Sequence, residues 1–83
     1  SNRSQDWFQQ AVRDLEQAED SRRAGRHEWA FFAAQQAAEK AVKERYPNSH
    51  PAGAPFEHYG PLQSEEAIRY AREILEFVRI QMA

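Results

Sequence analysis

Arg45 and His50 are the pair of side chains in this sequence with the clearest potential for chemistry. An Arg guanidinium stays charged and binds a phosphate group through two parallel hydrogen bonds. A His imidazole has an unperturbed pKa near neutrality, so it can take a proton from a nearby hydroxyl group. Together the two types could bind a phosphate group and transfer a proton beside it without a metal ion. Pro47 and Pro51 interrupt the same stretch, however, and such a loop holds catalytic groups less rigidly than a helix does.

Other polar side chains are weaker candidates. His58 could act as a second catalytic or phosphate-binding imidazole, or its ring could simply order the surrounding segment. Three cations gather near the end of the first expected helix, where they complement the helix dipole or, alternatively, bind phosphate: Arg22, Arg23 and Arg26. The sequence has no Cys and no Gly-rich phosphate loop. Its His and carboxylate residues are not spaced as the ligands of a metal site usually are. It therefore predicts no metal and no other cofactor.

Residues 28–44 form the helix around which the rest of the chain is organised. This stretch contains no Gly or Pro and consists mostly of Ala, Gln, Glu and Lys, which lose little side-chain freedom in a helix. Two overlapping series with helical spacing run along it. One begins with Trp29, Phe32 and Ala33, and the other with Ala30, Phe31 and Ala34. Because alanines let a neighbouring helix approach closely, we expect a central helix that packs on more than one side.

Two further helices flank this one. Ser4 or Asp6 can cap a first helix that runs to about Ala24, and Gly25 suits the left-handed residue that ends it. Such a short connection predicts a tight antiparallel hairpin with residues 28–44. All four prolines fall between residues 45 and 62, which predicts an extended loop. Its aromatic side chains either pin this loop to the bundle or stack on nucleobases: Tyr46, Phe56 and Tyr59. Ser64 is the expected cap of the last helix, whose apolar stripe runs to residue 82.

Length and composition suit one small domain spanning residues 1–83. A chain of 83 residues buries only a modest core, so we expect a partner subunit to complete it, most simply in a homodimer. The net charge of −2 argues against strong non-specific binding of nucleic acid. No apolar run is long enough to cross a membrane, and no signal peptide is visible. These features are compatible with the cytoplasm.

The sequence AAQQAAEKAVK resembles the signature of the HEPN domain, a small helical domain of many prokaryotic proteins. The segment from RYPNSHPAGAP to REILEFV is similar to the end of the same family, with an RYP turn, a Pro/Gly loop and a last amphipathic helix. The resemblance runs from about Trp7 to Val78. It implies an all-α, up-down helical bundle with a Pro/Gly-rich loop before the last helix.

The resemblance also implies catalytic, phosphate-binding or structural roles for the candidate residues. The R-x4-H spacing of Arg45 and His50 is similar to the R-x4-6-H motif of HEPN domains that cut RNA, which implies a metal-independent RNase with two sites facing each other in a dimer. Lys40 and Glu39, a polar pair in the alanine-rich helix, could meet the RYP arginine. Arg45 would then either bind phosphate with Lys40 and His58, or act as a structural partner of Glu39. Glu39 and Lys43 also have the spacing of a helix-supporting ion pair.

One departure from the family stands out. Similar HEPN domains usually carry one or two more helices before the RYP turn, whereas here Glu44 runs directly into Arg45. Three helices with broad apolar faces would leave an uncovered side that a fourth helix would fill. Either this protein has lost that segment, or residues of the natural protein are missing between Glu44 and Arg45, and the uncovered apolar side favours the second explanation.

Two functions are compatible with these observations. The first is a nucleotide-binding or nucleic-acid-binding module, with RNase activity as the toxin half of a toxin–antitoxin pair whose other member is a nucleotidyltransferase. The alternative is a non-catalytic helical module that docks such a nucleotidyltransferase. The R-x4-H spacing favours the first function, and the proline-broken motif with the acidic balance favours the second.

Overall fold

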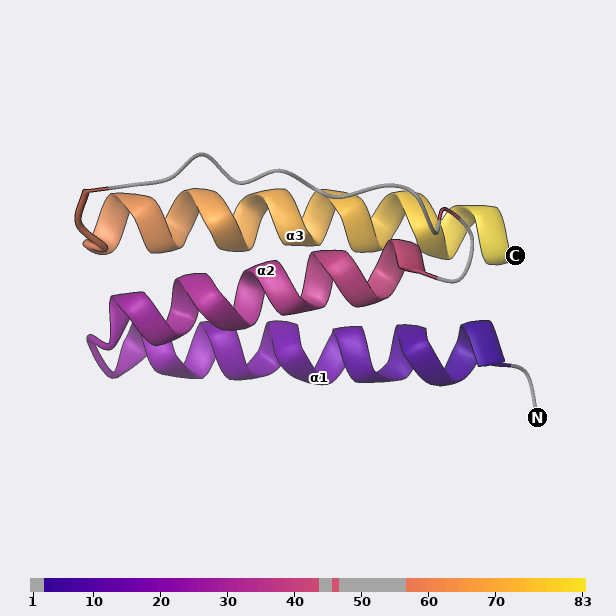
Figure 1. Ribbon diagram of the computed structural model, residues 1–83, viewed down its shortest axis with the longest axis horizontal. Coiled ribbons are helices and arrows are strands. Elements are labelled where there is room, and N and C mark those ends of the chain that lie inside the picture. The colour runs from indigo at the N-terminus through magenta and orange to yellow at the C-terminus, as the bar shows by residue number, and fades with distance from the viewer. Residues whose placement is uncertain (1–2, 44–45, 47–56) are drawn as a thin grey trace.

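The fold consists of three helices arranged side by side (Figure 1). The computed structural model describes residues 3–43, 46 and 57–83 of the chain. The helices are α1 (Arg3–Arg23), α2 (His27–Lys43) and α3 (Pro61–Met82), and the described residues include no strand. The expected all-α bundle is therefore confirmed.

The helices do not simply alternate in direction. α1 and α2 form the expected antiparallel hairpin, whereas α3 runs parallel to α2, and both begin at the same end of the bundle (Figure 1). A hydrogen-bond-length contact of 2.9 Å between His27 at the start of α2 and Ser64 in the first turn of α3 confirms this arrangement. α2 is 17 residues long, or about 25 Å, so the connection to α3 must span that distance. This requirement explains why so many residues separate α2 from α3 in the sequence.

A Schellman motif makes the turn between α1 and α2. Gly25 has φ of 79°, the left-handed conformation that glycine adopts without steric cost. Its amide donates to the Arg22 carbonyl at 2.9 Å, and the Arg26 amide donates to the Ser21 carbonyl at 2.9 Å. The Arg26 carbonyl then accepts from the Ala30 amide at 3.0 Å, so α2 begins at once. The prediction for Gly25 is confirmed.

The helix starts differ from those predicted by the N-cap rule. α1 already includes Arg3, so Ser4 and Asp6 lie inside the helix and not before its first residue. α3 begins at Pro61 after an extended Gly60, three residues before the predicted cap at Ser64. Pro suits the first helical position because its missing N–H would have no partner there. The Gln63 side chain accepts a hydrogen bond from the Gly60 amide at 3.0 Å and so completes the start of α3.

Alanine fills most of the interior, and α2 is its centre. α2 packs against both neighbours more extensively than they pack against each other, as its two apolar series predicted. The larger buried side chains come mainly from α3, while α1 and α2 contribute chiefly alanines: Ala11, Ala18, Ala30, Ala34, Ala37 and Ala38. Small side chains allow close helix approach but remove little apolar surface from water. None of the helices in the described part of the chain combines the length and apolar character that crossing a bilayer requires.

A buried hydroxyl fastens the three helices together at the hairpin end. Ser64 is fully buried in the first turn of α3. Its Oγ accepts from the Arg22 Nε–H of α1 at 3.1 Å and donates to the Pro61 carbonyl at 3.1 Å. A hydroxyl has one proton to donate, so His27 Nδ1, 2.9 Å away, must be the protonated donor in its own contact. The Arg22 guanidinium also pairs with Glu65 at 3.3 Å.

We expect Ser64→Ala to lower the free energy of unfolding by about 1–3 kcal/mol, because it leaves Arg22 and His27 without their shared buried acceptor. Ser21→Ala is the matched control. Ser21 is also buried, but among the described residues a single side chain, that of Gln17, bonds to its hydroxyl, at 3.0 Å. Urea unfolding followed by circular dichroism measures both variants. Equal losses in the two variants would contradict a fastening role for Ser64.

Candidate ligand-binding groove

Two of the predicted site residues, Arg45 and His50, lie outside the described residues. The structure therefore leaves the R-x4-H pair a prediction. Phe56, one of the aromatics expected to pin the loop, also lies outside them. The described neighbour Tyr46 donates its amide to the Val42 carbonyl at 2.8 Å, which continues the hydrogen-bond spacing of α2 by a further step.

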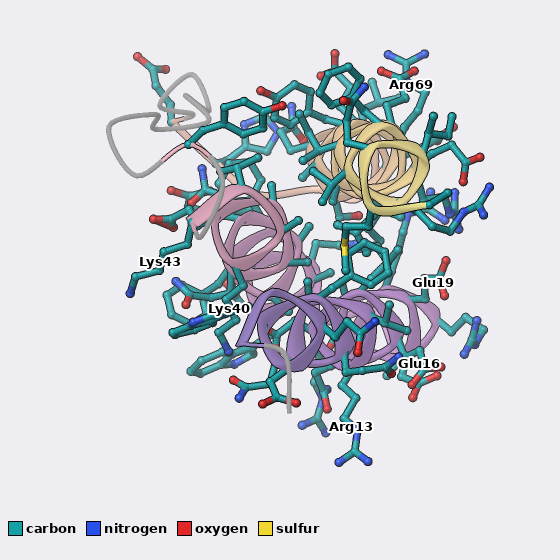
Figure 2. All side chains as sticks on the ribbon, turned by 90° about the vertical axis from the view of Figure 1, so that its right-hand side faces the viewer. Arg13, Glu16, Glu19, Lys40, Lys43 and Arg69 are labelled. Carbon is teal, nitrogen blue, oxygen red and sulfur yellow. The ribbon has the colours of Figure 1, made fainter. Side chains whose placement is uncertain are left out.

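Lys40 links the two helices of the hairpin by an ion pair. Its ammonium lies 2.9 Å from the Asp14 carboxylate of α1 (Lys40 is labelled in Figure 2). The contacting atom, Asp14 Oδ2, is buried and accepts no well-aligned hydrogen bond from the described residues. The positive charge of Lys40 therefore compensates the negative charge of this carboxylate. The predicted helix-supporting pair of Glu39 and Lys43 is not formed among the described residues. Lys43 instead lies over the Trp7 ring, 4.7 Å from its centroid.

His58 lies at the other end of the bundle from Lys40. Its exposed ring sits beside Gly60, just before α3 begins. The next residue, Tyr59, packs against Phe31 of α2 with ring centroids 5.0 Å apart and ring planes tilted by 55°, which confirms that this aromatic pins its segment to the bundle. Because Phe31 lies near the start of α2 and Lys40 near its end, the structure does not bring Lys40 and His58 into one site.

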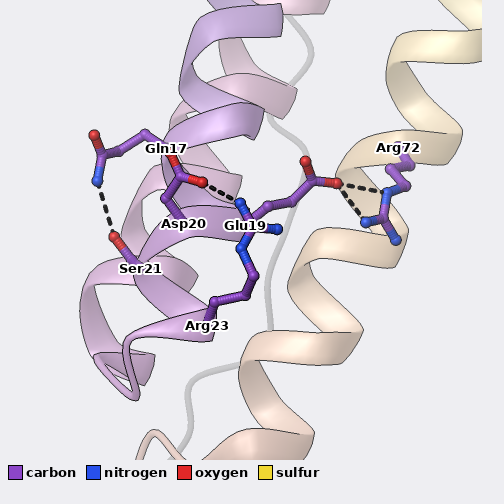
Figure 3. Close-up of polar contacts among 6 residues, drawn as sticks. All are labelled: Gln17, Glu19, Asp20, Ser21, Arg23 and Arg72. Carbon is purple, nitrogen blue, oxygen red and sulfur yellow. Dashed lines mark hydrogen bonds and ion pairs between the residues drawn. The ribbon is translucent and has the colours of Figure 1, made fainter.

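The three arginines at the hairpin turn have different surroundings. Arg22 belongs to the Ser64 contacts, and Arg23 pairs with Asp20 on its own helix (Figure 3). Arg26 is exposed, and its guanidinium has no hydrogen-bond or ion-pair partner within residues 3–43, 46 and 57–83. Of the cluster that could have bound phosphate, Arg26 is thus the arginine whose charge stays uncompensated.

Arg26 lines an open groove between α1 and α2 next to the hairpin turn. The groove has a volume of about 510 Å³, within the range of small-molecule sites. Trp29 and Phe32 form one wall, with ring centroids 6.4 Å apart and planes nearly perpendicular. They are 61% and 54% exposed, which is unusual for side chains of this size. The remaining lining residues come from both helices: Asp14, Gln17, Asp20, Ser21, Ala24, Ala33 and Gln36.

The charges of the groove leave one cation in excess. Its two carboxylates are already neutralised, Asp14 by Lys40 and Asp20 by Arg23. Arg26 supplies the surplus positive charge, and the amide groups of Gln17 and Gln36 can donate or accept hydrogen bonds. The groove therefore offers an aromatic surface for a planar ring and a cation for an anionic group.

The sequence contained part of this site. The helical series through Trp29, Phe32, Ala33 and Gln36 correctly places these residues on one face of α2. That series was interpreted as a packing face, and it did not identify the partner residues of α1. The signal that could have found the site is the occurrence of two large aromatics on an alanine-rich helix beside an arginine at its start.

Comparison with known proteins assigns the family. Residues 4–44 match the model of the HEPN domain family, just under half of the chain, and this segment covers α1 and α2. No curated protein matches the chain, and neither does any solved structure. The match ends at residue 44, so the resemblance of the C-terminal part and the missing segment after Glu44 stay predictions. The resemblance to the HEPN domain family is therefore confirmed for residues 4–44, the first two helices of the chain.

Proposed function

We propose that this HEPN chain is a nucleotide-binding module whose ligand lies in the groove between α1 and α2. The observation that carries the proposal is the combination of exposed Trp29 and Phe32 with the unpaired Arg26 in one groove. Stacking of a nucleobase on an aromatic side chain contributes about 1–3 kcal/mol to the binding free energy, and every base can stack in this way. A guanidinium at the edge of the same surface binds the phosphate group. The amides of Gln17 and Gln36 then face the edge of the base.

The resemblance extends the proposal beyond the groove. In this extended form, the chain acts in the cytoplasm as a homodimer and as the RNase half of a pair with a nucleotidyltransferase. The groove binds a nucleotide of the RNA, and Arg45 and His50 perform the cleavage.

A second candidate function is a non-catalytic module that docks a nucleotidyltransferase. Several large apolar side chains support it because they lie outside the core: Leu62, Tyr70, Phe77 and Ile80. Lys40, which was a candidate phosphate ligand, already holds Asp14. This function needs the helical surface but no chemistry at Arg45 or His50.

The groove is tested with adenosine monophosphate and a short single-stranded oligoadenylate, measured by isothermal titration calorimetry. Trp29→Ala should weaken binding about tenfold or more, because it removes the stacking surface. Arg26→Gln should weaken it by a similar factor, because it removes a charge-assisted contact to phosphate worth about 1.5–3 kcal/mol. Phe77→Ala and Arg13→Gln are matched controls on other surfaces, and both should bind normally. No binding by the unaltered chain, or equal losses in the controls, would overturn the proposal.

Cleavage is tested separately on the same oligonucleotide. His50→Ala should abolish cleavage with binding nearly intact, because proton transfer contributes about 10²–10⁴ in rate. Arg45→Ala should weaken RNA binding more than Arg79→Ala, whose arginine already pairs with Glu76 at 2.6 Å. Binding without cleavage by the unaltered chain would favour a binding module. If Arg45→Ala lowers only the melting temperature, the arginine is structural.

A further inference from the structure

A second pocket lies where the start of α2 meets the segment that leads into α3. It has a volume of about 280 Å³, and its described lining consists of Glu28, Trp29, Phe31, Phe32, Gln35 and Tyr59. Trp29 and Phe32 also line the groove between α1 and α2, so these two rings border both spaces. The other lining residues differ between the two, which makes the pocket a separate candidate site.

Four of the six lining residues of this pocket are aromatic, and their rings form two contacting pairs. Phe31 and Tyr59 have centroids 5.0 Å apart, and Trp29 and Phe32 have centroids 6.4 Å apart. Phe31 is buried, whereas Trp29, Phe32 and Tyr59 are exposed. The face of an aromatic ring carries negative potential, so several rings around one space favour a cation in that space.

The charge of the pocket also favours a cation. Glu28 is the charged residue of the described lining, and its exposed carboxylate has no hydrogen-bond or ion-pair partner within residues 3–43, 46 and 57–83. This carboxylate also offsets the positive end of the α2 dipole, which would otherwise disfavour a cation here. The groove between α1 and α2 differs, because Arg26 gives it a surplus positive charge.

The lining further selects the type of cation. Aromatic rings accept no ordinary hydrogen bond, so an ammonium group with N–H donors loses hydration without replacement wherever it touches them. A quaternary ammonium group has no N–H donor, and its methyl groups can pack against the rings while its charge interacts with their faces. Glu28 then balances the charge from the edge of the pocket. The lining therefore suits a quaternary ammonium group better than a primary one.

We propose that this pocket binds the quaternary ammonium group of a small organic cation, with the aromatic rings around its methyl groups and Glu28 beside its charge. The site goes beyond the proposed nucleotide groove and does not depend on it. Its volume suits the headgroup of a small compound. A methylated lysine in an extended peptide would gain backbone hydrogen bonds from a strand edge, and the described residues include no strand.

The first test compares choline with its uncharged isostere, in which a carbon atom replaces the ammonium nitrogen. Both have the same shape, so the comparison isolates the effect of the positive charge. Choline should bind about threefold or more tightly in isothermal titration calorimetry, because only the cation interacts with the ring faces and with Glu28. Equal binding of the two compounds, or no binding of choline by the unaltered chain, would overturn the proposal.

The second test assigns the binding to this pocket. Glu28→Gln keeps the shape of the side chain and should weaken choline binding about threefold, while the isostere binds as before. Tyr59→Leu keeps an apolar side chain without the ring, and it should weaken the binding of choline more than that of the isostere. Glu16→Gln is the matched control, because Glu16 is exposed on α1 without an ion-pair partner in the described chain (Figure 2).

Glu16→Gln should bind choline normally, and circular dichroism should show that each variant is folded. Equal losses in Glu16→Gln and Glu28→Gln would indicate attraction by the overall charge and would overturn the site. A trimethyllysine peptide that binds more tightly than choline would overturn the small-compound ligand. Choline binding without adenosine monophosphate binding would overturn the proposed nucleotide groove alone, and the reverse result would overturn this pocket alone.

Discussion

The close approach that alanine allows along α2 is the constraint on which the rest of the structure depends. Six of the eight buried residues of α2 are Ala, so α1 and α3 can lie close to its backbone on two sides. The same choice limits the hydrophobic stabilisation, because each buried methyl group removes little surface from water. A core of this kind needs additional fastening, and the structure supplies it with polar contacts at the ends and edges of the helices.

Those polar contacts engage many of the charged side chains. Ser64 gathers groups from all three helices at the hairpin end, Lys40 compensates the buried Asp14 oxygen between α1 and α2, and Arg72 pairs with Glu19 between α3 and α1 (Figure 3). Several cations that look available for phosphate in the sequence are therefore occupied in the fold. The cations that stay without an ion-pair partner in the described chain, such as Arg26 and Arg69, become the informative ones. Arg26 lies in the groove between α1 and α2, and Arg69 lies on the outer face of α3.

The aromatic side chains follow from the same constraint. The core is filled mostly by alanine, whereas the rings of Trp29, Phe32 and Phe77 lie largely on the surface. On α2 they form the wall of a groove next to an unpaired arginine.

The sequence alone determined the helical class, the central place of residues 28–44, the glycine at the hairpin turn and the family of the first two helices. These features depend on local spacing and on the backbone preferences of single residues, which a sequence states directly. It misplaced the start of α3, because Ser64 has the chemistry of an N-cap but is used in the interior. The R-x4-H pair lies outside the described residues and stays a prediction. Only the tertiary structure decided that α3 runs parallel to α2, which arginine lacks a partner, and that Trp29 lines a groove. Each of these depends on which side chains from distant segments meet, and no spacing within one helix encodes that.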